Sequence, residues 1–394
     1  MKQEIEKIVK SLNELKKVEI GGNGSNWVNI ADLGKCLRTN AIDVPCKLQT
    51  YLSSMPNYFE LYEDCTRSVK VVYVRVRNEQ QDASVHHEKN KYRLMDWAYL
   101  RDINDFLSQL KSMAISERWS FQNGLPGYPK DAILWSYIKY TFCRLQHQNK
   151  IIYSIDGNYS AFNTGLVDNR YIAIIALFKR NKRESASSEW IFHGFVFPGE
   201  GKGKILNSLF ADNAEPATYT DNAQNLIYDV TLGAPIVDNE HIIIRHIERL
   251  PKKLLEQAAP SITSLDGQVL GKEAQKEYYD NLRKYVMEHP PVYRYIVNRF
   301  SVAIELALKK VRWDYKYAVP MFYPKENRLC LLLPLCLVDD EHEDLALVVS
   351  KTPAEKYEGA TMLPLDWAYA DARVVSKPNC EWLDVNQIAG TVEA

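Results

Sequence analysis

The segment from Gln80 to Lys91 constrains the fold most, because it divides the chain. Its sequence, QQDASVHHEKNK, is polar and shows no apolar periodicity, so it offers no face to a packed core. Such a segment is typical of an interdomain linker. We therefore expect a small unit at residues 1–78, a linker at 79–92 and a larger unit at 93–394.

The small unit has the element order of a winged helix. Apolar residues between Ile5 and Leu15 recur on one helical face, which predicts a first helix. Two shorter helices are expected near residues 30–37 and 44–55, and two strands near 58–62 and 69–76. Three helices closed by a β-hairpin form a winged helix, which is a variant of helix-turn-helix.

Three stretches of the small unit, Trp27–Leu37, Cys46–Leu52 and Pro56–Leu61, resemble a LOTUS domain, also called OST-HTH. The resemblance implies a small winged helix associated with RNA. Lys35, Lys47 and Lys70 are then candidate RNA contacts, because lysines neutralise phosphates. The alternative is that these lysines only solvate the surface of a small domain.

The larger unit mixes helical and strand patterns in separate runs. Helices are expected near residues 95–113, 130–147, 273–288 and 292–311, and strands near 151–155, 171–179, 190–197, 226–230, 241–247, 330–337 and 344–349. Consecutive strands, then helices, then strands predict an α+β fold with a mostly antiparallel sheet.

A polar turn is expected within the stretch from Tyr159 to Lys179. Asn163, Thr164 and Gly165 lie between an aromatic residue and a β-branched run, with Asp168 just after them. A glycine turn at the mouth of a strand can present backbone N–H groups to a ligand. Alternatively it is a tight hairpin turn whose side chains bond their own backbone.

Two further groups of residues are candidates for ligand contacts. His241 and Arg245 share one face of the strand expected at 241–247, and Arg249 follows, which would suit an anion. The alternative is an arginine pair held by acids such as Asp229 and Glu248. Tyr369 and Arg373 lie four residues apart, so on a helix they would share a face that could hold a base. A buried pair of Arg373 with Asp366 or Asp371 is the other interpretation of that spacing.

Stretches of the larger unit, in the same order, resemble the family called domain of unknown function 3825. They are Phe162–Asp168, His241–Ile243, Arg249–Pro251, Tyr317–Pro320 with Tyr323–Pro324, Leu333–Leu335, and Ala368–Arg373 followed by Trp382–Leu383. The resemblance implies a fold and an association with RNA-linked helix-turn-helix domains, but no reaction.

Composition limits the classes of function. Lys and Arg number 49 and Asp and Glu 50, so overall charge does not indicate a nucleic-acid binder. The seven cysteines include no C-x-x-C pair and no zinc spacing, so we expect reduced thiols and no metal site. The N-terminus has no apolar signal core, and the apolar run Leu329–Val338 is too short for a bilayer. We expect a cytoplasmic protein, without a membrane partner and without an assigned cofactor.

Three functional hypotheses follow. The first is an RNA-binding protein whose larger unit binds a nucleotide, an RNA end or another phosphate-bearing small molecule. The second is an enzyme on nucleotides or RNA phosphates, with His241 as general acid or base. The third is an interaction scaffold, which predicts that the turn at Asn163–Asp168 lies far from Arg373. Homo-oligomerisation is left open.

Overall fold

The computed structural model describes two compact units, Met1–Lys89 and Asn90–Ala394. In the first unit the described residues are 8, 11, 12, 15, 17–20, 24–40, 48–53, 59–64 and 71–76. In the second they are 91–124, 128–182, 188–260 and 272–388. Each unit is described by itself.

The first unit contains a four-stranded sheet and two described helices. The sheet has the order β1-β2-β4-β3, formed by β1 (Val18–Ile20), β2 (Gly24–Asn29), β3 (Phe59–Asp64) and β4 (Val71–Val76). Asn29 caps α2 (Ile30–Thr39) by accepting a hydrogen bond from the N–H of Ala31, and α3 (Leu48–Ser53) follows. The predicted first helix lies mostly outside the described residues, and the pairing of β1 with β2 was not predicted.

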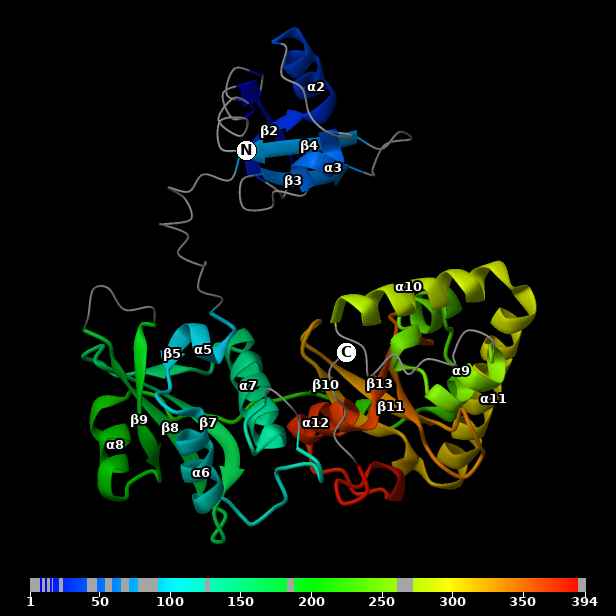
Figure 1. Cartoon of the computed structure of the whole chain (residues 1–394). Coiled ribbons are helices and arrows are strands. Elements are labelled where there is room, and N and C mark those ends of the chain that lie inside the picture. Colours follow the sequence, from blue (N-terminus) through cyan, green and yellow to red (C-terminus); the bar gives the residue numbers. More distant parts are fainter. Residues whose placement is uncertain are drawn as a thin grey trace. The chain divides into compact units, whose positions relative to one another are not determined.

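The second unit begins with a five-stranded sheet of order β5-β9-β8-β7-β6. Its strands are β5 (Ala98–Tyr99), β6 (Ile152–Tyr153), β7 (Tyr159–Val167), β8 (Ala173–Arg180) and β9 (Trp190–Val196), antiparallel except between β5 and β9. Helices α5 (Leu94–Trp97), α6 (Ile103–Met113) and α7 (Ala132–His147) share a core with one face, and α8 (Lys204–Leu209) shares a smaller cluster with the other. Figure 1 shows this arrangement.

A four-stranded antiparallel sheet forms the rest of the second unit, in the order β10-β11-β12-β13. Its strands are β10 (Val319–Tyr323), β11 (Arg328–Leu335), β12 (Leu345–Lys351) and β13 (Tyr357–Pro364). Side chains alternate across β11: Leu331 and Leu333 join the core of α9 (Lys252–Ala258), α10 (Lys272–Glu288) and α11 (Pro290–Trp313), whereas Leu332 faces the other way. This alternation buries both faces of the sheet.

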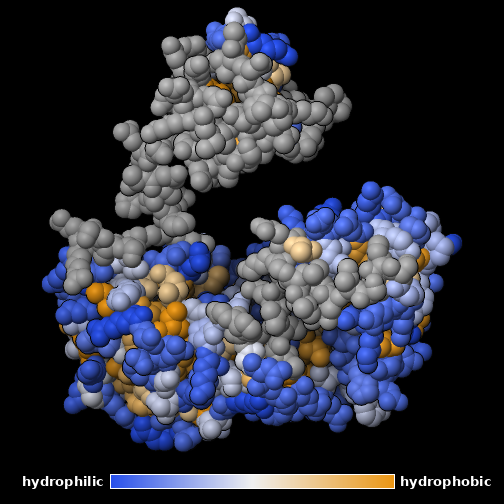
Figure 2. All heavy atoms as spheres, in the orientation of Figure 1, coloured by the Kyte–Doolittle hydropathy of each residue, from blue (hydrophilic) through white to orange (hydrophobic). Residues whose placement is uncertain are grey.

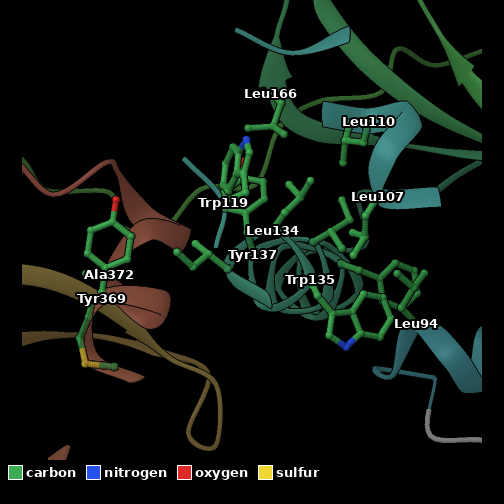
Figure 3. Close-up of a cluster of buried hydrophobic side chains, with 14 of the residues drawn as sticks. Leu94, Leu107, Leu110, Trp119, Leu134, Trp135, Tyr137, Leu166, Tyr369 and Ala372 are labelled. Atoms are coloured by element: carbon green, nitrogen blue, oxygen red, sulfur yellow. The ribbon is translucent and has the colours of Figure 1, made fainter. Parts of the chain in front are cut away.

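Helices α7 and α12 (Leu365–Val375) connect the two sheets. Leu134 and Tyr137 of α7, together with Tyr369 and Ala372 of α12, belong to one hydrophobic core that reaches residues of both sheets. Figure 3 shows these side chains on the facing helices. The predicted α+β class with antiparallel strands is therefore confirmed for this unit.

Several local predictions were wrong. The helix expected at 95–113 is broken at Arg101, whose φ of 66° is incompatible with a right-handed helix, and Asp102 caps the new start at α6. The strand expected at 241–247 is instead the π-helical turn η4 (Glu240–Ile244) followed by η5 (Ile247–Arg249). The strand expected at 226–230 is replaced by the 3₁₀ turns η2 (Ala223–Leu226) and η3 (Val230–Leu232), whereas β10 and β13 were not predicted.

The predicted turn at Asn163–Gly165 was also wrong. These residues lie inside β7, where the register with β8 shifts between Asn163 and Val167. The chain reverses later, and Tyr171 takes a φ of 62° in that turn. Gly165, with a φ of 76°, forms a β-bulge that the alternating pattern alone does not reveal.

The surface of the second unit is mainly polar, with apolar areas over the part that carries the first sheet (Figure 2). Among the described helices, none combines the length and apolar character that a membrane span requires.

Candidate anion-binding site

Arg249 lies at the end of η5, and its side chain is held against the second sheet. Its Nη1 donates hydrogen bonds to Thr361 Oγ1 at 3.1 Å and to the carbonyl of Met362 at 2.7 Å, both on β13. Its Cζ lies 5.3 Å from the ring centroid of Trp367 on α12, which is a cation–π contact. A neutral hydroxyl, a carbonyl and an indole therefore fix the orientation of this half-buried guanidinium.

No carboxylate of the described residues lies within 4.0 Å of Arg249. The neighbouring Glu248 bonds other residues: its Oε2 accepts a hydrogen bond from Arg283 Nη2 at 2.8 Å, and its Oε1 lies 3.4 Å from His246 Nδ1. Burial lowers the pKa of Arg249, with Glu248 and Tyr323 opposing that shift. Arg249 Nε and Nη2 make no hydrogen bond within the described ranges, so they can donate to an anion.

Asp371 lies one turn after Trp367 on α12, so the two side chains leave the same side of the helix. The Asp371 carboxyl makes no hydrogen bond to any described residue. Burial raises its pKa to about 8, although Lys139 of α7 opposes the shift. At neutral pH this carboxyl is therefore mostly protonated, and it can donate a hydrogen bond to an anion.

Lys139 and Tyr323 complete what we call the Arg249 cluster: Arg249, Trp367, Asp371, Tyr323 and Lys139. Burial raises the pKa of Tyr323, and Glu326, Cys330 and Asp371 add to the shift while Arg249 opposes it, so Arg249 and Asp371 both lie within electrostatic range of this phenol. Lys139 Nζ lies 5.3 Å from the ring of Trp135. With Asp371 protonated, none of these five residues is an ionised acid, whereas Glu326 and Glu248, outside the cluster, act on Tyr323 and on Arg249.

Two histidines lie beside this cluster. The rings of His241 and His246 are 6.0 Å apart, edge to face, and His241 is exposed. Burial lowers the pKa of His246, and the charge of Arg249 lowers it further, whereas Glu248 opposes both. His246 is therefore mostly neutral at pH 7. Arg245, from the same predicted group, is exposed and makes no side-chain hydrogen bond to the described part of the chain.

The predicted alternative of an arginine pair held by Asp229 and Glu248 was wrong. Asp229 caps η3 by accepting hydrogen bonds from the N–H and hydroxyl of Thr231, and Glu248 bonds Arg283. Neither acid forms an ion pair with Arg245 or Arg249 in the described residues, although the charge of Glu248 raises the pKa of Arg249. The charge of Arg249 therefore needs a different explanation from ordinary surface pairing.

Asn163, Thr164 and Asp168 have structural roles. Asn163 Nδ2 donates to the carbonyl of Ala214, and its Oδ1 accepts from the N–H of Gly165. The fully buried Thr164 donates to the carbonyl of Ile174. Burial opposes ionisation of Asp168, but hydrogen bonds from the N–H of Ile172 and from Arg170 lower its pKa below the ordinary value. Each of these side chains accepts a hydrogen bond from a backbone N–H group two residues later, as the structural interpretation predicted. Asn163 and Thr164 do so at a β-bulge and not in a hairpin turn.

Tyr369 and Arg373 point to the opposite side of α12 from the Arg249 cluster, into the shared core. Arg373 pairs with Glu117, and not with Asp366 or Asp371 as the alternative predicted. Its Cζ lies 4.9 Å from the ring of Tyr137, whose hydroxyl reaches Gly165. The β7 bulge and Arg373 therefore lie on either side of the buried Tyr137 side chain, and they do not face each other across a ligand pocket.

The predicted RNA contacts are only partly described. Lys35 is exposed on α2, 4.0 Å from Asp32, whereas Lys47 and Lys70 lie outside the described residues. Among the described residues no group of three or more His, Cys, Asp or Glu side chains could hold a metal ion.

Sequence reasoning missed most partners of Arg249. Trp367 and Asp371 have the same four-residue spacing as Tyr369 and Arg373, which would have indicated a second functional face on this helix. Lys139 gave no comparable signal, because its relation to Asp371 depends on the packing of α7 against α12.

A family model described as "Domain of unknown function (DUF3825)" matches residues 110–382, which include the whole Arg249 cluster. No LOTUS domain is detected in the chain. Comparison with curated proteins and with solved structures gave no match. The winged helix of the first unit thus stays a prediction.

Proposed function

The chain belongs to the DUF3825 family, and from that premise we propose that its larger unit binds a phosphate group of a nucleotide or an RNA end at the Arg249 cluster. One observation carries the proposal. Arg249 is a half-buried guanidinium, oriented by Thr361 and Met362, without a carboxylate partner among the described residues. Guanidinium groups match phosphate oxygens in pairs, so a phosphate would supply the missing countercharge.

The surroundings of Arg249 favour a nucleotide or RNA end over a bare phosphate ion. Trp367 and Tyr323 are half-buried aromatic residues of the cluster, and such rings stack on bases. Protonated Asp371 can donate a hydrogen bond to a phosphate oxygen. The resemblance of the small unit to LOTUS domains supports RNA as the source, with Lys35, Lys47 and Lys70 as the recruiting cations. The free thiols among the described cysteines support a cytoplasmic setting.

The test compares RNA oligonucleotides that differ only in a terminal phosphate, at fixed salt, with the full chain. We expect the phosphorylated RNA to bind more tightly. Arg249→Gln should weaken its binding by about 10- to 100-fold, because a charge-assisted hydrogen bond contributes roughly 1.5–3 kcal/mol. Arg245→Gln is the matched control, since it removes the same charge from an exposed position four residues earlier.

Equal losses in Arg249→Gln and Arg245→Gln would show only a general effect of charge, and the proposed site would be wrong. Equal binding of phosphorylated and unphosphorylated RNA would likewise contradict it. Circular dichroism of both variants checks that they are folded.

A phosphate-processing enzyme is the second candidate, because a protonated acid and a neutral histidine lie in the region of the proposed anion site. The charge of Arg249 acts on His246, and Arg249 and Asp371 both act on Tyr323. A protonated acid and a neutral base in this region can transfer protons. His241 lies next to His246. Incubation with nucleotides and RNA, with and without divalent metal, tests this activity. Turnover that survives the combined Asp371→Asn and His246→Gln replacement would exclude these residues as its catalysts.

A further inference from the structure

A pocket of about 600 Å³ lies on the side of α12 away from the Arg249 cluster. Glu117 and Arg118 line one part of the pocket. The rest of the lining comes from the end of α11, from the following turn η7 (Tyr315–Tyr317), from Tyr369, and from residues within 377–387. This volume lies within the range of small-molecule sites. The pocket is thus large enough for a planar heterocycle with an attached sugar.

An unpartnered hydroxyl group lines this pocket. Tyr369 is only 1% exposed, yet its hydroxyl makes no hydrogen bond to a described residue. Burial raises the pKa of Tyr369 to about 12, and Glu117 adds to the shift while Arg373 opposes it. The hydroxyl therefore stays neutral, and it can both donate to and accept from a ligand in the pocket.

Aromatic surfaces form another wall. The indole of Trp313, at the end of α11, is 82% exposed, and its ring centroid lies 6.4 Å from that of Tyr317. Both residues line the pocket. An exposed indole beside a pocket offers a free face on which a planar ring can stack.

The charges of the pocket are balanced. Its cations are Arg118, Lys316 and Lys377, and its acids are Glu117, Asp314, Glu381 and Asp384. Glu117 is neutralised by Arg373, so three cations face three acids. The amide side chains of Asn379 and Gln387 also line the pocket and make no hydrogen bond to the described residues. A balanced lining with free amides suits a neutral ligand with donor and acceptor edges, not an anion.

We propose that this pocket binds a nucleobase, either of a free nucleoside or of an RNA residue taken out of its stack. The base stacks on Trp313, and the Tyr369 hydroxyl and the amides of Asn379 and Gln387 bond its edge. This site is separate from the Arg249 cluster and needs no phosphate, so the two proposals can fail independently.

The test titrates the full chain with adenosine, guanosine, cytidine and uridine by calorimetry, at low and high salt. At least one nucleoside should bind with an affinity nearly independent of salt, because the ligand is neutral. Trp313→Ala should weaken that binding about tenfold through lost stacking. Tyr369→Phe, which removes only the hydroxyl, should weaken it about fivefold. Displacement by single-stranded RNA would identify the base of an RNA chain as the source, and its absence a free nucleoside.

Tyr315→Ala is the matched control, because Tyr315 is 56% exposed in the same turn but does not line the pocket. Its nucleoside affinity should stay within about twofold of the wild type. The proposal is overturned if no nucleoside binds, or if Trp313→Ala and Tyr315→Ala have equal effects. It is also overturned if Arg249→Gln abolishes nucleoside binding while Trp313→Ala leaves it intact. Trp313 is at the surface, so its replacement keeps the test valid even if Tyr369→Phe does not fold.

Discussion

Arg373 and Glu117 form a two-bonded ion pair inside the larger unit. The bonds run from Nε to Oε1 at 2.6 Å and from Nη2 to Oε2 at 2.8 Å, and the two side chains are 11% and 10% exposed. The guanidinium Cζ also lies 4.7 Å from the ring of Trp119. The pair therefore fixes α12 against the segment that follows α6, and α12 carries Trp367 and Asp371 on its other side.

Removing one partner of this pair should destabilise the protein. We expect Arg373→Gln to lower the free energy of unfolding by about 3–5 kcal/mol, because Glu117 would keep a buried charge without compensation. Urea unfolding followed by circular dichroism measures the change. Arg118→Gln is the control: Arg118 is adjacent to Glu117, but within the described part of the chain it donates only to Ser120 and Asn386, so its loss should cost less than about 1.5 kcal/mol.

The double variant Arg373→Met with Glu117→Met sharpens this prediction. Replacement of a whole buried pair by apolar side chains is often neutral, so the double variant should be more stable than Arg373→Gln. A double variant as unstable as the single one would mean that shape, and not charge, dominates at this position.

Asp371 should make stability depend on pH. Its pKa is about 8 in the folded protein, above the ordinary value of 3.8, so between these values the folded state holds a proton that the unfolded state releases. Stability is therefore lost as pH rises through this window. We expect Asp371→Asn to be more stable than the wild type at pH 8–9, by roughly 1–3 kcal/mol, and to differ little near pH 4. Urea unfolding at several pH values measures both.

Asp212→Asn controls for the loss of a carboxylate, because Asp212 is exposed. A pH dependence of the same size in this variant would show that the effect is not specific to Asp371. If the wild type instead gained stability relative to Asp371→Asn as pH rose, Asp371 would be ionised in the folded protein and the proposed neutral donor would be excluded.

Long periodic segments were predictable from the sequence, whereas segments defined by tertiary packing were not. The helix expected at 130–147 is α7, and the one expected at 273–288 is α10, because apolar residues recur at helical spacing over the length of each. The run from His241 to Ile247 was wrongly predicted to be a strand, because consecutive isoleucines favour a strand. In the structure Ile242, Ile243 and Ile244 are all buried by a π-helical turn packed near β13.

The candidate site was predictable only in part. Arg249 was expected to face an anion, and the absence of a carboxylate partner in the described residues is compatible with that expectation. The other residues of the cluster could not be predicted to lie together. Lys139, Tyr323 and Asp371 come from three elements, and their arrangement depends on two sheets sharing one core. Conversely, Asn163 and Thr164 matched a ligand-binding pattern but are used by a β-bulge.

The three candidate lysines of the small unit, Lys35, Lys47 and Lys70, should determine the salt dependence of RNA binding. Replacing Lys35, Lys47 and Lys70 together by Gln removes up to three phosphate contacts, so the slope of log affinity against log salt should become shallower by about 2 for single-stranded RNA. Filter binding or fluorescence anisotropy over a salt series measures the slope. Replacement of Lys179, Lys253 and Lys356, exposed lysines of the larger unit, is the matched control. Equal slopes for the two triple variants would contradict RNA recruitment by these lysines.

Gly165 should not tolerate a side chain, for two separable reasons. Its φ of 76° strains any L-residue, and a Cβ atom there would lie 2.5 Å from the hydroxyl of Tyr137. We expect Gly165→Ala to lower the free energy of unfolding by about 2–4 kcal/mol. Gly157→Ala is the control, because Gly157 has a similar φ of 68° but its Cβ would meet only the end of the Arg180 side chain at 3.7 Å. It should cost about 1–2 kcal/mol.

Tyr137→Phe separates the clash from the backbone strain. It removes the hydroxyl that the new Cβ would meet, so it should recover at least about 1 kcal/mol in the Gly165→Ala background and nothing in the Gly157→Ala background. The coupling is measured by urea unfolding of the two double variants and their parents. If Tyr137→Phe recovers neither or both, Tyr137 does not contact the bulge. In that case the physical connection from β7 through Tyr137 to Arg373 would be lost, because Tyr137 is the side chain that joins the bulge to the buried ion pair.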